Sequence, residues 1–190
     1  PAFGVERTGA PIQAFLRVAR DAILNRRKVY QPHLIVVFDE SLLEQVPVME
    51  GIKPGGAVLI NTERDPSDLA ALGSKVFTVP ATRISLEFGL GSKALPIVNA
   101  AMIGAVMRLI GADMEPALEA VRENVPAKPE ANADAAAAAY DAVHGPDMPD
   151  AFLLKRLGAD EAEEAVGAHA GNGTAPYTGL DAPAWGQPMS

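Results

Sequence analysis

The residues best suited to chemistry stand directly after short apolar runs of this 190-residue sequence. Asp39 and Glu40 follow LIVVF, Asn61 and Thr62 follow AVLI, and Arg83 comes shortly after KVFTV. Acidic side chains in such places accept ribose hydroxyls in nucleotide-binding folds, and an arginine can bind a pyrophosphate or carboxylate through two parallel hydrogen bonds. Each residue also has a structural alternative. Asp39 and Glu40 would form a helix-capping or surface pair, Asn61 would fix its loop through backbone hydrogen bonds, and Arg83 would be a solvated charge on a helix.

A second set of candidates lies in the opening segment, PAFGVERTGAP, where Glu6, Arg7 and Thr8 stand between Gly4 and Gly9. The planar guanidinium of Arg7 suits a phosphate or a substrate carboxylate. A loop ion pair or a contact with another subunit is the structural alternative. The glycines suit backbone conformations that other residues avoid, and this use is favoured over ligand binding.

Several kinds of catalytic site are excluded by residue type and spacing. There is no cysteine, which excludes disulfides, thiolate chemistry and cysteine ligands for an iron–sulfur cluster within these residues. His33, His144 and His169 are too far apart to form a spaced metal motif. No Ser–His–Asp set or carboxylate pair is indicated, so the sequence offers no nucleophile or general base. Asn99 is expected to be buried in an apolar helix, and the basic residues 26–28 to form a solvated turn rather than a phosphate site.

The elements that must position these residues are predicted strands that alternate with short helices along the chain. Apolar runs at residues 34–38, 57–60 and 75–79 predict three buried strands, and the alternating segment 12–18 predicts another. Short helices are expected between the strands, which suits parallel crossover connections. The sequence therefore predicts an α/β fold, an open, mostly parallel, Rossmann-like sheet flanked by helices. Ligands of such sheets gather at the carboxyl ends of the strands.

Five helices are predicted. Ser41 and Ser67 are the expected N-caps of the two short ones, and Asp113 that of a later one. The last is rich in alanine, which favours helix but buries little side chain, so we expect it to lean on the domain rather than form core. The five ranges are residues 41–49, 67–72, 96–110, 116–124 and 131–143.

Charge is unevenly distributed over the chain. Residues 1–110 hold 12 Lys and Arg against 10 Asp and Glu, a net +2, whereas residues 111–190 hold 4 against 14, a net −10. The acidic half argues against nucleic acid as a partner. It indicates a solvated acidic surface, or a docking face for a basic partner. No apolar run is long enough to span a membrane and no secretion signal is visible, so the cytoplasm is the expected compartment.

The predicted domain organisation is a domain over residues 1–145 and an acidic extension over 146–190, partly helical and then extended, which could wrap a partner. A doubly wound sheet normally opens with a strand, a glycine turn and a helix. This sequence contains no GxGxxG and opens with proline in a loop. We therefore expect that the first strand–glycine turn–helix unit precedes this chain or comes from another one.

Six segments, in register, resemble motifs of one enzyme family. They are similar to the gamma subunit, or gamma domain, of the pyruvate/2-oxoacid:ferredoxin oxidoreductases, over roughly residues 2–125. The matching segments are 3–11 (FGVERTGAP), 14–18 (AFLRV), 34–39 (LIVVFD), 53–61 (KPGGAVLIN), 79–86 (VPATRISL) and 96–105 (PIVNAAMIGA). Val5 replaces a usual proline, Pro80 a usual aspartate, and the family's opening GRGGQG turn is not in this sequence.

The resemblance implies a subunit that is not active alone. Such complexes decarboxylate a 2-oxoacid oxidatively with thiamine diphosphate and Mg²⁺, pass electrons through [4Fe-4S] clusters to ferredoxin or another acceptor, and usually form an acyl-coenzyme A. The expected partners are the alpha, beta and delta-type subunits, which hold those cofactors, while this chain holds none. Glu6, Arg7, Thr8, Asn61 and Arg83 are then the residues expected near coenzyme A or a subunit interface. A purely architectural subunit and a stand-alone nucleotide-binding oxidoreductase remain the alternatives.

Overall fold

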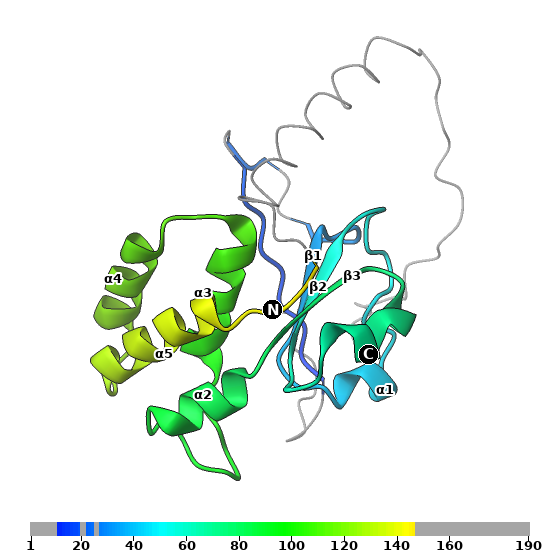
Figure 1. The fold of residues 1–190 in the computed structure, drawn as a ribbon. Coiled ribbons are helices and arrows are strands. Elements are labelled where there is room, and N and C mark those ends of the chain that lie inside the picture. Colours follow the sequence, from blue (N-terminus) through cyan, green and yellow to red (C-terminus); the bar gives the residue numbers. More distant parts are fainter. Residues whose placement is uncertain (1–10, 20–21, 25–26, 147–190) are drawn as a thin grey trace, which may run out of the picture. The chain divides into compact units, whose positions relative to one another are not determined.

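A three-stranded parallel sheet organises the chain (Figure 1). The computed structural model describes residues 11–19, 22–24 and 27–146. Its strands are β1 (Leu34–Val37), β2 (Ala57–Asn61) and β3 (Lys75–Val79), in the order β1-β2-β3. All five residues of the central strand β2 are buried, as expected of a strand covered on both faces. The predicted open parallel α/β sheet is confirmed.

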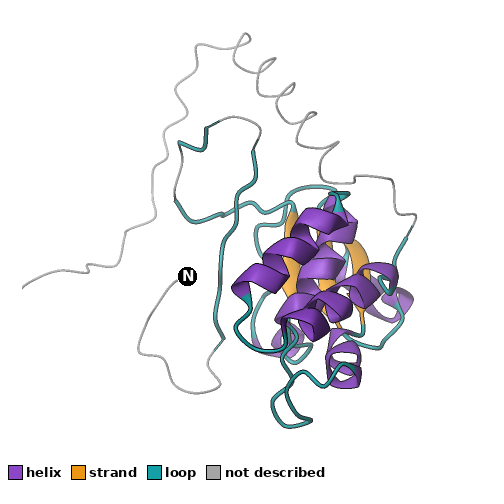
Figure 2. Ribbon diagram, turned by 90° about the vertical axis from the view of Figure 1, so that its left-hand side faces the viewer, coloured by secondary structure: helices purple, strands orange, loops and turns teal. Residues whose placement is uncertain are grey.

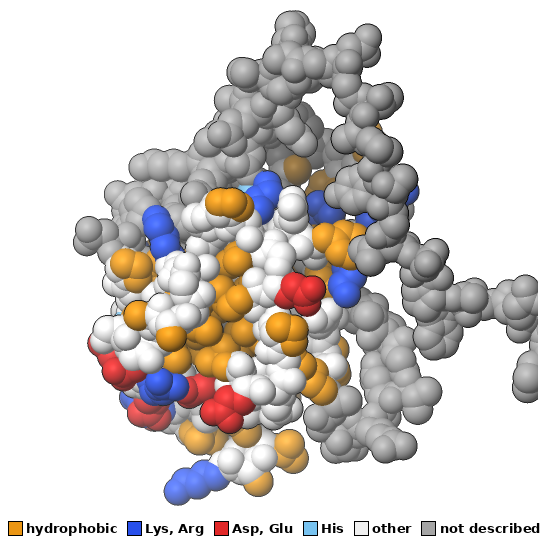
Figure 3. All heavy atoms as spheres, turned by 90° about the vertical axis from the view of Figure 1, so that its right-hand side faces the viewer, with side chains coloured by type: hydrophobic (Ala, Val, Ile, Leu, Met, Phe, Trp, Pro, Cys, Tyr) orange, Lys and Arg blue, Asp and Glu red, His pale blue; other side chains and the backbone are white. Residues whose placement is uncertain are grey.

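One face of the sheet is covered by two short elements, α1 (Leu42–Gln45) and the 3₁₀-helix η1 (Pro66–Leu72). Leu69 of η1 packs with Val37, Val58, Ile60 and Val76 of the strands, in one of the buried clusters. On this side of the molecule hydrophobic side chains gather at the centre, with most charged side chains around them (Figure 3).

The predicted capping of these two elements is only partly right. Asp65, not Ser67, is the N-cap of η1, and its Oδ1 accepts a hydrogen bond from the Ser67 backbone N at 2.9 Å. Ser41 stands at the N-cap of α1, but its side chain makes no capping bond. The predicted helix over residues 41–49 is reduced to one turn, because Pro47 follows Val46 and the chain is extended there.

Four helices form the layer on the other face, where Figure 2 shows them in front of the strands. The first, second and fourth of them enclose the largest apolar cluster, which includes Leu59, Phe77, Met102 and Leu109, and the third packs in a smaller cluster that includes Val121. Asp113 caps the third of them as predicted, and its Oδ1 accepts from the Glu115 backbone N at 3.2 Å. The four are α2 (Ala81–Glu87), α3 (Asn99–Ile110), α4 (Met114–Asn124) and α5 (Pro129–Asp141).

The alanine-rich helix α5 is part of the core, so the prediction that it only leans on the domain is wrong. Ala135, Ala136 and Ala139 are fully buried. A methyl group on Gly104 of α3 would lie 1.9 Å from the carbonyl oxygen of Ala136, so the two helix backbones are in direct contact. Small side chains bury little area each, but they allow an approach at which backbone atoms themselves become packing surface.

Two further predictions fail. Residues 12–18 form no strand, and Ile12, Leu16 and Val18 are exposed; in the part of the chain that is described, no strand pairs with them. Asn99 is exposed rather than buried, because α3 begins at this residue and not at Pro96.

The chain divides into two units, Pro1–Leu157 and Gly158–Ser190, and every described residue belongs to the first. The predicted extension from residue 146 lies almost entirely outside the described residues and stays a prediction. Over the described ranges, no helix combines the length and the apolar character that a membrane crossing requires.

Candidate functional site

Asn61 ties three elements together where the strands end. Its Nδ2 donates to the Phe38 carbonyl after β1 at 2.9 Å and to Oγ1 of Thr82 in α2 at 2.8 Å, while its Oδ1 accepts from the Thr82 backbone N at 3.0 Å. The N-cap of α2 is Pro80, which has no side chain able to accept a bond, so the cap comes from β2 instead. Asn61 is 9% exposed and fully engaged. This geometry matches the structural alternative predicted for Asn61, in which its side chain fixes the loop through hydrogen bonds to the backbone.

Glu40 forms the centre of a second polar cluster at the same edge. One carboxylate oxygen accepts from the Thr62 hydroxyl at 2.5 Å, and the other pairs with Arg64 Nη1 at 2.9 Å. The Thr62 hydroxyl first, and then Arg64, holds the pKa of Glu40 below its ordinary value. Glu40 is therefore ionised at neutral pH and is engaged by neighbours of this chain, which matches the ion-pair alternative better than a ribose acceptor.

Arg83 lies one residue beyond Thr82 and is half exposed, with 49% of its side chain accessible. It pairs with Glu87 one helical turn along at 2.7 Å, and its Nε lies 3.9 Å from Glu63. An exposed pair of this kind stabilises a helix only slightly, so it can be exchanged for another anion. Glu6, Arg7 and Thr8 lie outside the described residues, and their roles stay predictions.

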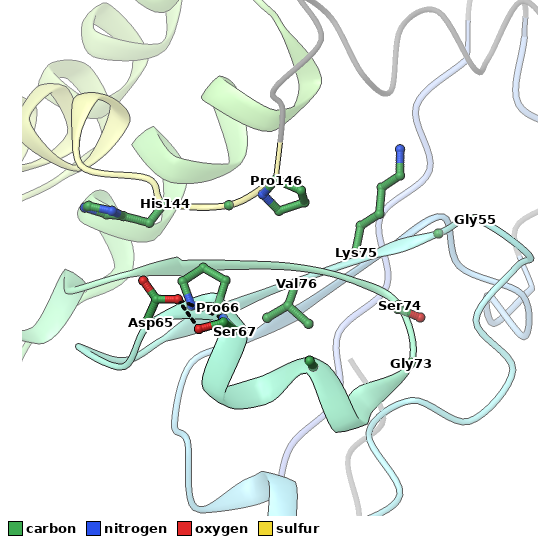
Figure 4. Close-up of a pocket in the computed structure, with 13 residues that line it drawn as sticks. Gly55, Asp65, Pro66, Ser67, Gly73, Ser74, Lys75, Val76, His144 and Pro146 are labelled. Carbon is green, nitrogen blue, oxygen red and sulfur yellow. Dashed lines mark hydrogen bonds between the residues drawn. The ribbon is translucent and has the colours of Figure 1, made fainter.

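Two open hollows flank these residues. The smaller, of about 230 Å³, is lined by Arg83 together with Thr62, Glu63, Arg64 and Pro80 among others. The larger, of about 720 Å³, runs beside β3 between η1 and the segment after α5 (Figure 4). Neither Asn61 nor Arg83 lines it. Of the candidates predicted from sequence, Arg83 and Thr62 therefore border the smaller hollow, whereas Asn61 lines neither of the two.

The larger hollow has polar side chains that do not converge on one point. Asp65 accepts from the Ser67 hydroxyl at 2.6 Å, and the Ser67 bonds, followed by nearby His144, lower its pKa. In Figure 4, Asp65 and His144 lie at one end, whereas Lys75 and Ser74 lie at the other. Ligand sites normally combine an enclosed cavity with convergent polar groups, so this hollow does not have the form of a catalytic centre.

His144 was noted in the sequence only as an isolated histidine, yet its backbone extends the sheet. Thr78 N donates to the His144 carbonyl and His144 N to the Thr78 carbonyl, both at 2.8 Å. This isolated antiparallel bridge pairs with the outer edge of β3 at Thr78. A single residue after a helix carries no periodic pattern, so no sequence signal marks it.

Two of the cofactors implied by the resemblance, a magnesium ion and an iron–sulfur cluster, do not fit the described residues. No group of three or more His, Asp or Glu side chains in these ranges is placed to hold a metal ion. The sequence has no cysteine to ligate a cluster. The chemistry of the donor sets thus gives neither a magnesium nor an iron–sulfur site in this part of the chain.

Comparison with known proteins identifies the family. Residues 1–142 match the family described as pyruvate ferredoxin/flavodoxin oxidoreductase. The chain belongs to this family. It is 44% identical over 143 residues to pyruvate synthase subunit PorC of Methanocaldococcus jannaschii, covering 74% of this chain and 76% of that protein. It is 42% identical over 147 residues to the common subunit gamma of the pyruvate/ketoisovalerate oxidoreductases of Thermococcus kodakarensis, covering 74% and 77%.

A solved structure of the family has a related fold. The pyruvate oxidoreductase subunit PORC of Thermotoga maritima is similar with a TM-score of 0.54 and 28% identity, over 63% of this chain and 67% of that one. The prediction of a gamma-type subunit of a pyruvate/2-oxoacid:ferredoxin oxidoreductase is confirmed. None of these comparisons places a cofactor or substrate on particular residues of this chain.

Proposed function

We propose that this family member works as the gamma component of a thiamine-diphosphate-dependent complex that decarboxylates a 2-oxoacid, usually to an acyl-coenzyme A, with ferredoxin or another acceptor taking the electrons. The observation that carries the proposal is the match of residues 1–142 to the oxidoreductase family, with relatives named as gamma or PorC subunits. Alpha, beta and delta-type subunits would supply thiamine diphosphate, Mg²⁺ and the [4Fe-4S] clusters. The same proposal places the complex in the cytoplasm, where coenzyme A is available.

The chain's own contribution at the strand ends is one of positioning. Asn61 and Glu40 have their polar atoms engaged within the chain, and no convergent set of reactive groups is formed by the described residues. An architectural contribution at this edge is therefore favoured over a chemical one. Arg83 is the described candidate that can still meet a coenzyme A phosphate or a partner carboxylate. Glu6, Arg7 and Thr8, which lie outside the described residues, stay candidates for the coenzyme A or subunit interface.

Reconstitution tests the proposal. The chain is coexpressed with alpha, beta and delta-type subunits, and the purified material is examined for native mass, iron content and reduction of a viologen dye with a panel of 2-oxoacids. We expect an iron-containing hetero-oligomer that includes this chain and loses turnover when it is omitted. A chain that stays monomeric beside folded partner subunits, or a complex equally active without it, would contradict the proposal.

Separate variants divide positioning from ligand binding. Arg7→Ala and Arg83→Ala are compared in intact complexes, with KM for coenzyme A and kcat measured separately. If turnover with saturating coenzyme A falls at least about tenfold in a complex of normal mass, which corresponds to about 1.4 kcal/mol, the residue takes part in the reaction. Unchanged KM and kcat for both variants would support the architectural role.

A further inference from the structure

The outer edge of β3 carries backbone groups that another strand could bond. β3 is the last strand in the order β1-β2-β3, and the Val79 carbonyl faces β2, where it accepts from Thr62 N at 3.1 Å. Backbone groups of successive strand residues point to opposite sides, so Thr78 and Val76 turn their N–H and C=O groups to the outer edge. The strand sequence, KVFTV, is rich in residues that favour strands. An unprotected edge of this kind is a template for pairing with another chain.

The segment that follows α5 lies against this edge. The backbone of His144 makes both hydrogen bonds of the isolated bridge to Thr78, each at 2.8 Å. Figure 1 shows the end of the described chain, in yellow, returning from α5 to the strands. We call residues 144–146 the edge strap. Its bonds occupy the outward groups of Thr78, so a strand from elsewhere can reach them only after the strap has left.

Gly145 sets how closely the edge strap approaches the core. A methyl group on Gly145 would lie 2.0 Å from Cδ1 and 2.6 Å from Cε1 of Phe77. The φ of Gly145 is outside the left-handed region, so contact rather than backbone conformation requires glycine here. Phe77 is fully buried in the largest apolar cluster, where close packing resists movement of its ring. A larger residue at position 145 would therefore displace the strap and not Phe77.

Pro146 ends the pairing after one residue. The antiparallel register that pairs His144 with Thr78 brings Pro146 opposite Val76. Proline has no backbone N–H, so it cannot donate to the Val76 carbonyl and the ladder stops. Pro146 and Val76 line the larger hollow together (Figure 4). The strap itself turns only the backbone of Gly145 outward, between a residue already bonded and a proline, and so it is too short to be a new edge.

We propose that the edge strap blocks the outer edge of β3 from pairing with the same edge of a second copy of this chain. Short edge segments and proline are devices by which sheet proteins prevent such pairing. Without the strap the edge would be self-complementary. In a two-fold antiparallel pair, Val76 of each copy would lie opposite Thr78 of the other, and both pairs would exchange N–H and C=O groups. This inference concerns the fold and does not rest on the proposed function.

A purely structural role of the edge strap makes a different prediction. If the strap only packs on Phe77, its displacement should lower stability and leave self-association unchanged. If it blocks the edge, displacement should expose the Thr78 amide and also strengthen self-association. The Val76 amide then locates the contact, because no backbone group among the described residues bonds its outward N–H.

Sedimentation of the full chain over a range of concentrations, with hydrogen exchange of single amides, tests the inference. We expect Gly145→Val to lower the dissociation constant for self-association at least about tenfold relative to the unmodified chain. At low concentration its Thr78 amide should exchange at least about tenfold faster, since the bond to His144 is lost. At high concentration the Thr78 and Val76 amides should both become protected. The matched control is Ala120→Val, at an exposed position of α4, which should change these quantities no more than about twofold.

A second variant keeps the test decisive if Gly145→Val does not fold. His144→Pro removes the N–H that bonds the Thr78 carbonyl and adds nothing against Phe77, so it should change exchange and association in the same direction. A folded variant whose Thr78 amide is released while self-association stays unchanged would overturn the inference. So would stronger association that leaves the exchange of the Val76 amide unaltered, because the contact would then lie elsewhere on the chain.

Discussion

Replacing Asn61 by alanine measures how much the tie between β1, β2 and α2 contributes to stability. Asn61→Ala removes three hydrogen bonds and leaves the Thr82 backbone N and the Phe38 carbonyl without their partner. A buried group left unsatisfied costs about 1–3 kcal/mol. Phe38 is 44% exposed, so water can reach its carbonyl, and the Thr82 hydroxyl can rotate toward solvent. We therefore expect a loss of about 2–4 kcal/mol in the free energy of unfolding.

Urea denaturation followed by circular dichroism checks this value. With a slope of about 2 kcal/mol per molar urea, the midpoint should fall by about 1–2 M. The matched control is Asn124→Ala, since Asn124 is exposed and makes a single side-chain bond, to the Ala120 carbonyl at 2.8 Å. We expect that variant to lose less than about 0.5 kcal/mol. Equal losses for the two variants would refute the assignment of Asn61 as a structural tie.

Three further variants test other parts of the fold, the first two by urea denaturation and the third by thermal unfolding at several pH values. Gly104→Val should destabilise by about 3 kcal/mol or more, because its side chain would overlap the Ala136 carbonyl, which cannot rotate away. Ser85→Ala should be neutral or stabilise by up to about 1 kcal/mol, because the Ser85 hydroxyl is buried without a hydrogen-bond partner. The lowered pKa of Glu40 implies stability that is present above its ordinary value of 4.5 and lost as the pH falls through the folded-state value. Thr62→Val should therefore flatten the dependence of the unfolding temperature on pH between about 5 and 3.

The sheet was predictable because its signal is local. Each strand is a short apolar run ended by polar residues, and β2 is buried along its whole length. Because such runs alternate with short helices, the sequence predicts parallel crossover connections. This prediction does not depend on how the side chains pack in the core. Asp113 was also predictable, because a capping residue acts on the N–H groups two or three positions away in its own chain segment.

The failures concern interactions between distant segments. Helix α5 has a sequence typical of a peripheral helix, and only the close approach of Gly104 makes its alanines core residues. Residues 12–18 alternate as a strand does, but alternation specifies a strand only when a neighbouring backbone accepts its hydrogen bonds. The cap of α2 comes from Asn61, 20 residues before the helix starts at Ala81, which no local capping pattern reveals.

The two described candidates of the predicted site differ in what ligand binding would cost them. A phosphate that recruits Arg83 has to displace Glu87 from an exposed ion pair, which is worth only about 0.2–1 kcal/mol. A ligand that recruits Asn61 has to replace all three of its bonds and uncap α2, at a cost of about 2–4 kcal/mol before any gain. The same edge of the sheet thus holds one residue that can change partners and one that cannot. Arg83 is consequently the position where a functional effect separate from stability is expected, whereas any effect of Asn61 on turnover should follow from the loss of the folded subunit.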